Sequence, residues 1–300
     1  MADELPFVAE PPGDVARAHD LAAQAALHWE LPAALHLRSG MNVLYVCGDE
    51  VVLRVCRPTT PPMQALWLAE YLTSCGLRVA RPVRHDVVER DGLACMAIER
   101  LHPVGPTDWE EVGRMMRVVH DLPVDELSGR YPLPRGASFP HWRVEQLRDE
   151  IDDLLDAAAR EALDAALVCH NGWRERAAAE PQVVCHGDVH PGNVLQTADG
   201  PVLLDWDLMC RAPSAWDHAA LMTWEERWGG DPQLYERFAA GYGSSLRGDP
   251  MGDELAELRL LVATMMRVRA GRHDPAAAAE AQRRLRFWQG DPDAPVWRPA

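Results

Sequence analysis

The clearest absence in this sequence of 300 residues is lysine, because all 30 of its basic residues are arginines. Any role that a lysine ammonium commonly fills must therefore fall to a guanidinium, whose planar fork binds oxyanions well but is longer and less compact. Positive charge is scarce overall, since 46 Asp and Glu residues bring the net charge to −16. We therefore expect no nucleic-acid partner, because a phosphate backbone needs a basic surface. The acidic balance permits a cationic substrate, although its usual effect is only solubility.

Long apolar runs are also missing. No stretch reaches the roughly 20 residues that a membrane-spanning helix needs. Residues 1–6 lack the basic and then apolar character of a secretory signal. The sequence therefore predicts a cytoplasmic protein with no membrane partner. The seven cysteines include no C-x-x-C pair, and their odd number favours reduced, mostly buried thiols. The pairs at 169–170 and 185–186 join Cys to His, but neither has zinc-finger spacing, so we expect no zinc site.

The most informative stretch runs from residue 183 to residue 207. A short apolar segment leads into His-Gly-Asp-x-His-x-x-Asn at 186–193, and a later apolar segment ends in Asp-Trp-Asp at 205–207. Apolar segments bounded by Gly, Pro and Asp predict strands, with a hairpin turn at 198–200. Three oxygen-bearing side chains, Asp188, Asn193 and Asp205, should then converge at the strand ends. Hard oxygen ligands of this kind suit Mg²⁺.

This spacing is that of a kinase catalytic loop, in which Asn follows Asp by five positions and a metal-binding Asp comes later. The particular two-part pattern at 186–207 resembles the aminoglycoside phosphotransferase family of kinase-like small-molecule kinases. The resemblance covers roughly residues 35–270. It implies an α+β, bilobal, protein-kinase-like fold with a small antiparallel-sheet N-lobe and a larger, mostly helical C-lobe.

The resemblance also implies roles for the residues of the motif. Asp188 would be the catalytic base or would orient the acceptor hydroxyl, and Asn193 and Asp205 would hold Mg²⁺. Gly187 stands where protein kinases carry an Arg that reads a phosphorylated segment. Only twelve positions separate Asp205 from Asp217, too few for a long regulatory segment. We therefore expect a constitutively competent small-molecule kinase rather than a phospho-regulated protein kinase.

Four further residues around the motif receive roles from the resemblance. His186 and His190 would belong to the scaffold of the loop, although a His could also act as a base near neutral pH. Asp217 would brace the catalytic loop; the alternative is simple charge at the beginning of a helix. Asp207 would either contact the residues that ligate the metal or ligate the metal itself.

The first half of the chain matches the family less closely. A turn at Ser39-Gly40 stands where backbone N–H groups cover the ATP phosphates in kinases, and an ordinary hairpin is the alternative. Arg54 stands where kinases place the Lys that holds the α- and β-phosphates, unless strand alternation points it to solvent. The following helix has no Glu at the place that would pair with this cation. Gln64 is the nearest substitute, through a neutral hydrogen bond.

A shift to Pro and Gly at 99–106 predicts a hinge between two lobes. By resemblance, backbone groups of Glu99 and Leu101 would bind adenine there. The lobes would be 1–101, which binds nucleotide and contains a helix at about 14–29, and 102–300, which carries catalysis and substrate binding. Irregular structure is expected at 1–13 and after Gly290. Apolar patterns predict strands within 35–55 and a hairpin at 83–101, and helices at 63–72, 109–120, 142–156, 161–178, 216–228, 233–242, 254–269 and 276–288.

The expected function is ATP-dependent transfer of the γ-phosphate to a hydroxyl of a small molecule. The acceptor could be an aminoglycoside-like antibiotic, a sugar or an amino alcohol, and neither ATP over GTP nor the oligomeric state follows from the sequence. An aromatic cluster at 224–242 suits a cationic or sugar-like acceptor, with core packing as the alternative. A second class of function is a nucleotide-binding pseudokinase scaffold without transfer activity. The missing Lys and Glu favour that class, whereas the intact Asp188, Asn193 and Asp205 oppose it.

Overall fold

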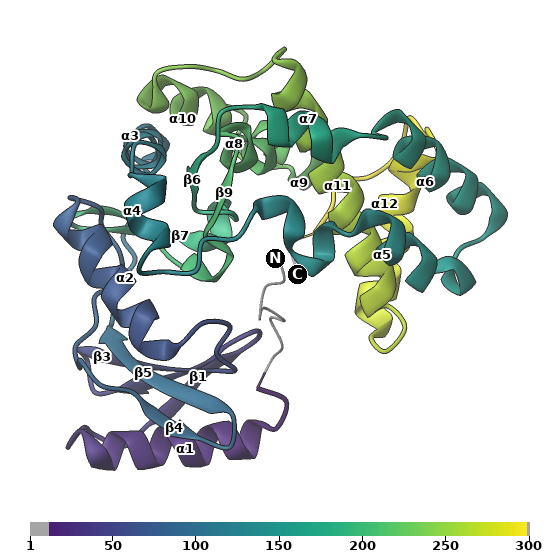
Figure 1. The fold of residues 1–300 in the computed structure, drawn as a ribbon. Helices are drawn as coiled ribbons and strands as arrows, with labels where there is room; N and C mark the ends of the chain where they lie inside the picture. Colours follow the sequence, from purple (N-terminus) through teal and green to yellow (C-terminus); the bar gives the residue numbers. More distant parts are fainter. Residues whose placement is uncertain (1–11, 299–300) are drawn as a thin grey trace.

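The computed structural model describes residues 12–298 and shows two lobes (Figure 1). The smaller lobe is an antiparallel sheet of five strands in the order β1-β2-β3-β5-β4. The α+β, two-lobed architecture predicted from the sequence is confirmed, as are its three strands within 35–55 and its hairpin turn at 91–92. Residues 1–11 lie outside the described residues. The strands are β1 (Leu35–Ser39), β2 (Val43–Cys47), β3 (Val51–Cys56), β4 (Val88–Arg90) and β5 (Leu93–Glu99).

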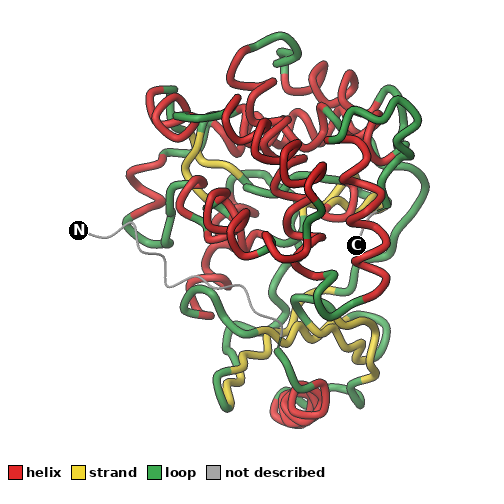
Figure 2. Tube along the Cα trace, turned by 90° about the vertical axis from the view of Figure 1, so that its right-hand side faces the viewer, coloured by secondary structure: helices red, strands yellow, loops and turns green. Residues whose placement is uncertain are grey.

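Helix α1 (Val15–His28) covers the face of this sheet that is turned away from the larger lobe (Figures 1 and 2). Its N-cap is Asp14, whose carboxylate accepts a hydrogen bond from the N–H of Ala16 at 2.8 Å. Small apolar residues of α1 bury against Tyr45 and Leu53, which alternation places on the same face of the sheet. The opposite face carries Arg54, which register aligns with Leu44 of β2 and with Met96 of β5.

Helix α2 (Pro62–Ser74) joins the two lobes. Its Leu66 packs against Met96 of the small sheet, whereas Leu68 and Leu72 belong to the core of the larger lobe. The face of the sheet that carries Arg54 is thereby held next to the larger lobe. This packing positions the functional site.

The larger lobe is mostly helical, with two short antiparallel pairs of strands. Its strands are β6 (Val183–Cys185) with β9 (Cys210–Ala212), and β7 (Val194–Thr197) with β8 (Gly200–Leu203). Its helices are α3 (Trp109–His120), α4 (Val124–Ser128), α5 (Val144–Glu150), α6 (Ala157–Cys169), α7 (Trp173–Ala179), α8 (Ala215–Met222), α9 (Trp224–Trp228), α10 (Leu234–Tyr242), α11 (Pro250–Ala270) and α12 (Pro275–Trp288).

Several predicted helices of this lobe are interrupted. The helix predicted at 142–156 is α5 followed by a 3₁₀ turn, because Asp156 caps a new helix by accepting the N–H of Ala159 at 2.7 Å. The helix predicted at 161–178 is α6 and α7, which are separated by residues 170–172, where Gly172 has the left-handed φ of +79° directly before α7. The helix predicted at 216–228 likewise divides into α8 and α9 at Thr223. The predicted loop at 121–141 contains α4.

The other helices lie within a few residues of their predicted bounds, with α3 matching at both ends and α11 four residues longer at its start. All seven cysteines are free thiols, and five of them are buried, which confirms that prediction. Each helix within 12–298 is too short or too polar to span a bilayer.

Helices α3 and α10 pack against each other at two glycines. A Cβ atom on Gly113 would lie 2.0 Å from the carbonyl oxygen of Phe238, and one on Gly241 would lie 1.7 Å from that of Glu110. Backbone therefore meets backbone here, and no side chain can move to make room. This contact therefore sets the distance between α3 and α10, two helices that pack in the core next to the catalytic loop.

We expect Gly113→Ala to destabilise the fold by about 1–3 kcal/mol, because overpacking against backbone outweighs the gain of about 1 kcal/mol in helix propensity. Urea unfolding followed by circular dichroism measures this change. Gly129→Ala is the control, since the nearest atom would be 3.4 Å away and φ is already −72°. Its stability should stay within about 0.5 kcal/mol of wild type. Equal stability of both variants would contradict the close approach.

A buried histidine lies where α8 meets α10. His218 has 0% of its surface exposed, its Nδ1 lies 3.1 Å from the hydroxyl of Tyr235, and its ring packs edge-on against Phe238 and Tyr242. Burial, with a smaller contribution from the neighbouring His120, lowers the pKa of His218 to about 4. The ring is therefore neutral in the folded protein at physiological pH.

The stability of the protein should consequently fall on acidification from pH 6.5 to pH 4. Unfolded histidine takes up its proton near pH 6.5, whereas His218 resists protonation down to about pH 4, so the unfolded state binds more protons in this window. The contribution lost by pH 4 is on the order of 3 kcal/mol. Urea unfolding at half-unit pH steps measures it, and His218→Phe should reduce the slope without abolishing it, because burial also lowers the pKa of His141 to about 4. His85→Gln, at an exposed position, should retain the full wild-type slope.

Candidate active site

The loop after β6 has a backbone that only glycine permits at one position. Gly187 has φ of +91°, and a Cβ atom there would lie 1.9 Å from the carbonyl oxygen of Leu208. The segment 186–188 therefore passes directly against the segment that follows Asp205. These two parts of the motif are in contact because position 187 has no side chain.

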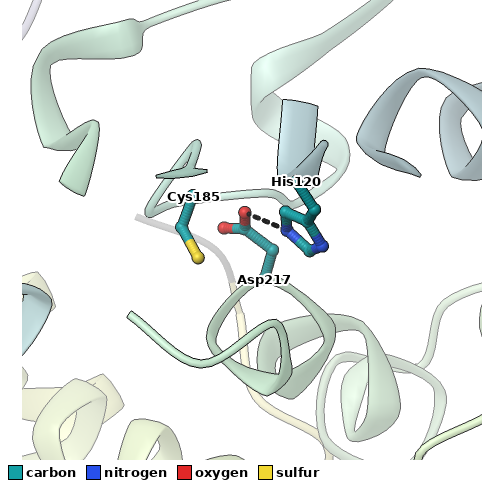
Figure 3. Close-up of side chains that lie close together, drawn as sticks. All are labelled: His120, Cys185 and Asp217. Atoms are coloured by element: carbon teal, nitrogen blue, oxygen red, sulfur yellow. Dashed lines mark hydrogen bonds and ion pairs between the residues drawn. The ribbon is translucent and has the colours of Figure 1, made fainter. Parts of the chain in front are cut away.

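A buried carboxylate braces the same loop. Asp217 on α8 is 1% exposed and accepts the N–H groups of His186 and Gly187, both at 2.8 Å. It also accepts a hydrogen bond from Nε2 of His120 on α3, at 3.1 Å (Figure 3). Burial alone would raise the pKa of Asp217, but the His120 hydrogen bond and the loop N–H groups hold it below its ordinary value. The predicted brace is confirmed.

Cys185 lies beside this pair in Figure 3, and the three side chains are close enough to suggest a metal site. Hydrogen bonds account for all of them, however. The carboxylate of Asp217 is engaged by three donors, and the thiol of Cys185 lies 3.5 Å from the carbonyl oxygen of Pro213. Burial also raises the pKa of this thiol, which keeps it protonated. The group is therefore a structural brace.

The two histidines of the motif support the loop, as predicted. His186 is fully buried, donates from Nε2 to the carbonyl oxygen of Leu204 at 2.9 Å and packs against the ring of Trp206. His190 accepts the N–H of Gly192 through Nδ1 at 3.0 Å, which leaves the hydrogen on Nε2. That Nε2 lies 3.5 Å from the carboxylate of Asp188.

The structure brings Asp188 and Asn193 into direct contact. The Asn193 amide nitrogen donates to the backbone carbonyl of Asp188 at 3.0 Å and to its Oδ2 at 3.1 Å. The other carboxylate oxygen, Oδ1, accepts Nη2 of Arg259 on α11 at 2.6 Å. Burial would raise the pKa of Asp188, but His190 and Arg259 together hold it well below its usual range. Asp188 is therefore ionised at neutral pH.

Asp205 and Asp207 face Arg54 from the other side of the site. Arg54 makes a hydrogen-bonded ion pair with Asp207, and its Nη2 lies 3.9 Å from Oδ1 of Asp205. Asp205 has φ of +59°, an uncommon backbone conformation for a residue other than glycine and one that clusters at functional sites. Burial and the neighbouring Asp207 raise the pKa of Asp205. Acidic side chains of the larger lobe thus meet a cation of the small sheet.

This pairing decides against two alternatives that the sequence left open for Arg54. Its side chain is only 17% exposed, so strand alternation does not point it to solvent. Gln64 does not substitute for the missing helical acid either, because its Oε1 is buried without a hydrogen-bond partner among the described residues. The physical reason is charge: a buried guanidinium is stabilised far more by a carboxylate than by an amide, and Asp207 lies within reach.

The remaining predicted positions lie apart from this group. Register places the Ser39 side chain with Val43 on the α1 face of the sheet, and its hydroxyl is 2.8 Å from Nε2 of His36. Glu99 binds Arg81 through its carboxylate, at 3.0 Å to Nε and 2.7 Å to Nη2. Gly40 is in the exposed turn after β1, and Leu101 is at the connection between the lobes.

Sequence reasoning missed two partners. It named Asp207 without recognising it as the partner of Arg54, and it did not consider Arg259. A signal for Arg259 was present, because this cation interrupts a largely apolar stretch of α11, and a cation on such a stretch needs a counter-charge. Which of the 46 acids supplies that charge depends on tertiary packing alone.

Comparison with known proteins identifies the family. Residues 42–261, well over half of the chain, match the model of the phosphotransferase enzyme family. No curated protein matches the sequence significantly. Solved structures do match it, at identities that establish similarity of fold only.

One such structure is spectinomycin phosphotransferase APH(9)-Ia in complex with ADP and spectinomycin, at 15% identity and a TM-score of 0.64, covering 86% of this chain and 89% of that one. A second is APH(2")-IIIa with GDP and kanamycin, at 16% identity and a TM-score of 0.65, with coverage of 87% and 94%. A third is amicoumacin kinase with AMP-PNP and Ca²⁺, at 14% identity and a TM-score of 0.64, covering 90% of this chain and 93% of that one. This chain therefore belongs to the phosphotransferase enzyme family and shares the fold of these antibiotic kinases.

Proposed function

We propose that this protein transfers the γ-phosphate of ATP to a hydroxyl of a small molecule in a Mg²⁺-dependent reaction. The observation that carries the proposal is the meeting of Asp188, Asn193, Asp205 and Arg54, four side chains from three parts of the chain, around one small region. Phosphoryl transfer needs positioning and charge neutralisation more than covalent help, and this group supplies both. In this proposal, residues 1–101 form the nucleotide-binding lobe and residues 102–300 the catalytic and substrate lobe.

The nucleotide would lie against the face of the small sheet that carries Arg54. Register places the apolar side chains of Leu44, Val52 and Ile98 on that face, which suits a purine ring. At the connection between the lobes, the N–H of Leu101 has no hydrogen-bond partner within residues 12–298, so it is available to a base. Arg54 would bind phosphate oxygens. Two of the similar kinases hold ADP and AMP-PNP and one holds GDP, so both purines must be tested.

The side chains present fit a divalent cation. Asn193 uses its amide nitrogen on Asp188, which leaves its amide oxygen as a ligand, and Asp205 offers a carboxylate whose pKa is raised by burial and by the neighbouring Asp207. The ion supplies neutralisation of the negative charge on the phosphate oxygens when it is bound. The Ca²⁺ in the similar amicoumacin kinase supports a divalent ion of this kind.

Asp188 would orient the acceptor hydroxyl and accept its proton. Because this carboxylate is ionised at neutral pH, it can accept a hydrogen bond from the hydroxyl as soon as the acceptor binds. A weak base is sufficient, since in a loose transition state the proton is transferred late. The ion pair between Arg54 and Asp207 weakens the pseudokinase alternative. That alternative was favoured by the missing Lys on the strand and the missing Glu on the following helix, and Arg54 and Asp207 now form an ion pair in their place.

Part of the predicted aromatic cluster supports an acceptor with a ring. The Trp224 ring is stacked on His190 at 5.8 Å between centroids, and Trp228 is stacked on Trp224 at 4.9 Å, so an aromatic surface extends from the catalytic loop. Both tryptophans are partly exposed. By contrast, Tyr235 and Phe238 are buried and belong to the core. Exposed aromatic rings bind the apolar faces of sugars, which favours a sugar-containing acceptor over a simple amino alcohol.

The first test is ADP and GDP release with Mg²⁺ and ATP or GTP across aminoglycosides, spectinomycin, other sugar-containing antibiotics, free sugars and amino alcohols. We expect at least one compound to stimulate release by wild type, with ATP as the better donor. Asp188→Asn should lose about 10³-fold or more of that stimulation while its melting temperature still rises with Mg-ATP. Asp164→Asn is the control, because its half-exposed carboxylate pairs with Arg148 of α5 and not with any residue of the proposed site. Mg-ATP binding without stimulation by any compound would instead favour the scaffold.

A second test concerns Arg54. Arg54→Met should raise the KM for ATP by about tenfold to a hundredfold, since a charge-assisted hydrogen bond contributes about 1.5–3 kcal/mol. The KM of Arg54→Lys for ATP should lie between those of wild type and Arg54→Met, because lysine retains the positive charge but lacks the planar fork of the guanidinium. Arg90→Met is the matched control, as Arg90 belongs to the same sheet but pairs with Asp91 at the surface. A KM for ATP that stays at the wild-type value in Arg54→Met would refute a phosphate-binding role.

A further inference from the structure

Arg259 contacts two successive residues of the catalytic loop. Its Nη2 donates to Oδ1 of Asp188 at 2.6 Å, and its Nη1 donates to the carbonyl oxygen of Gly187 at 3.2 Å. The side chain is only 16% exposed, so most of the guanidinium is removed from water. A guanidinium in such a place needs close acceptors, and both of its acceptors belong to this loop. The contact joins residues 71 positions apart in the sequence.

This contact complements the brace from Asp217. Asp217 takes the N–H of Gly187, whereas Arg259 takes the C=O of the same residue. The two side chains come from α8 and α11, which pack directly against each other in the larger lobe. Gly187 is thus held at both of its backbone polar groups, and the loop has little freedom to rotate. Asp188 follows immediately, so its backbone is fixed from both helices.

The carboxylate of Asp188 is fixed in the same way. Its two oxygens have different partners on different sides: Oδ1 is bound by Arg259 of α11, and Oδ2 by the amide of Asn193. Rotation of the carboxylate about its Cβ–Cγ bond would break both hydrogen bonds. The Nη1 and Nη2 atoms of the Arg259 guanidinium reach two acceptors at once. A lysine ammonium at the end of a flexible chain would not reproduce this geometry.

We propose that Arg259 is a positioning residue for the transfer reaction, which sets the orientation of the Asp188 carboxylate toward the acceptor hydroxyl. This inference rests on the proposed function of Asp188. It places part of the control of catalysis on α11, a helix that contributes no residue to the 186–207 motif. Other charged and titratable groups near Asp188 are His186 and His190 of its own loop, Asp205, and His141, which precedes α5. Arg259 differs from the histidines of the loop in reaching both the carboxylate and the backbone of the loop from another helix.

The test compares steady-state kinetics of Arg259→Met and Arg259→Lys with wild type, using the acceptor that the panel identifies. Arg259→Met should lower kcat by about tenfold or more, because a charge-assisted hydrogen bond to the reacting carboxylate is lost. The KM for ATP should remain within about twofold, since Arg259 does not bind nucleotide. Arg259→Lys should recover only part of kcat. Arg272→Met is the matched control, because Arg272 follows the end of α11 and pairs with Asp153 at 2.7 Å, and both of its parameters should stay near wild type.

A double-mutant cycle separates positioning from a general structural effect. If Arg259 acts through Asp188, Arg259→Met should lower kcat little further in an Asp188→Asn background, within about twofold. Losses that multiply independently would overturn the inference, as would an unchanged kcat in Arg259→Met.

Wild type, Arg259→Met, Asp188→Asn and the double variant also give a cycle in melting temperature. This second cycle does not depend on an activity assay. Arg259→Met should lower the melting temperature clearly more when Asp188 is intact than in the Asp188→Asn background. Equal losses in both would show that the contact does not form and would overturn the inference regardless of kinetics. A different result is also possible: the melting temperatures are coupled, but wild type releases no ADP in response to any acceptor. That result would confirm the contact but reject the proposed function, and the positioning role would be rejected with the proposed function.

Discussion

The catalytic loop depends on one buried carboxylate. Asp217 is removed from water, and such a charge is tolerated only because three N–H donors, two from the loop and one from His120, surround it. The same three bonds join α3, α8 and the end of β6, so the position of the loop and the packing of the lobe cannot change independently. Asp188 is positioned by this arrangement because it follows the two anchored residues directly, and Asn193 is in turn hydrogen-bonded to Asp188.

The absence of lysine has a consequence that reaches across the two lobes. A guanidinium at position 54 extends farther than an ammonium would, and its carboxylate partner is Asp207 of the larger lobe rather than an acid of the nearby helix α2. The cation of the small sheet and the acids after β8 therefore form one charged unit. A nucleotide phosphate that binds Arg54 must share this guanidinium with Asp207, so nucleotide binding and the relative placement of the lobes are coupled.

The sequence predicts the parts of this site that are local and misses those that depend on packing. The spacing within 186–193 and the strand that carries Arg54 were readable, because they follow from turn residues and alternation. The partners were not: His120 and Asp217 are 97 positions apart, and only tertiary packing, in which α3 and α8 both pack against α10, brings them together. Helices α6 and α7 were predicted as one because apolar spacing continues across Gly172, whose left-handed backbone breaks the helix without disturbing that pattern.

Counting the charges around Asp188 explains why the proposed reaction needs a divalent cation. Three carboxylates, Asp188, Asp205 and Asp207, face two guanidinium groups, Arg54 and Arg259, which leaves an excess of one negative charge. This crowding contributes to the raised pKa of Asp205. A polyphosphate entering such a site would meet repulsion, because both of the cations are already paired. A doubly charged cation held by Asp205 and Asn193 would reverse that balance, which is the electrostatic reason for including a divalent cation in the proposed reaction.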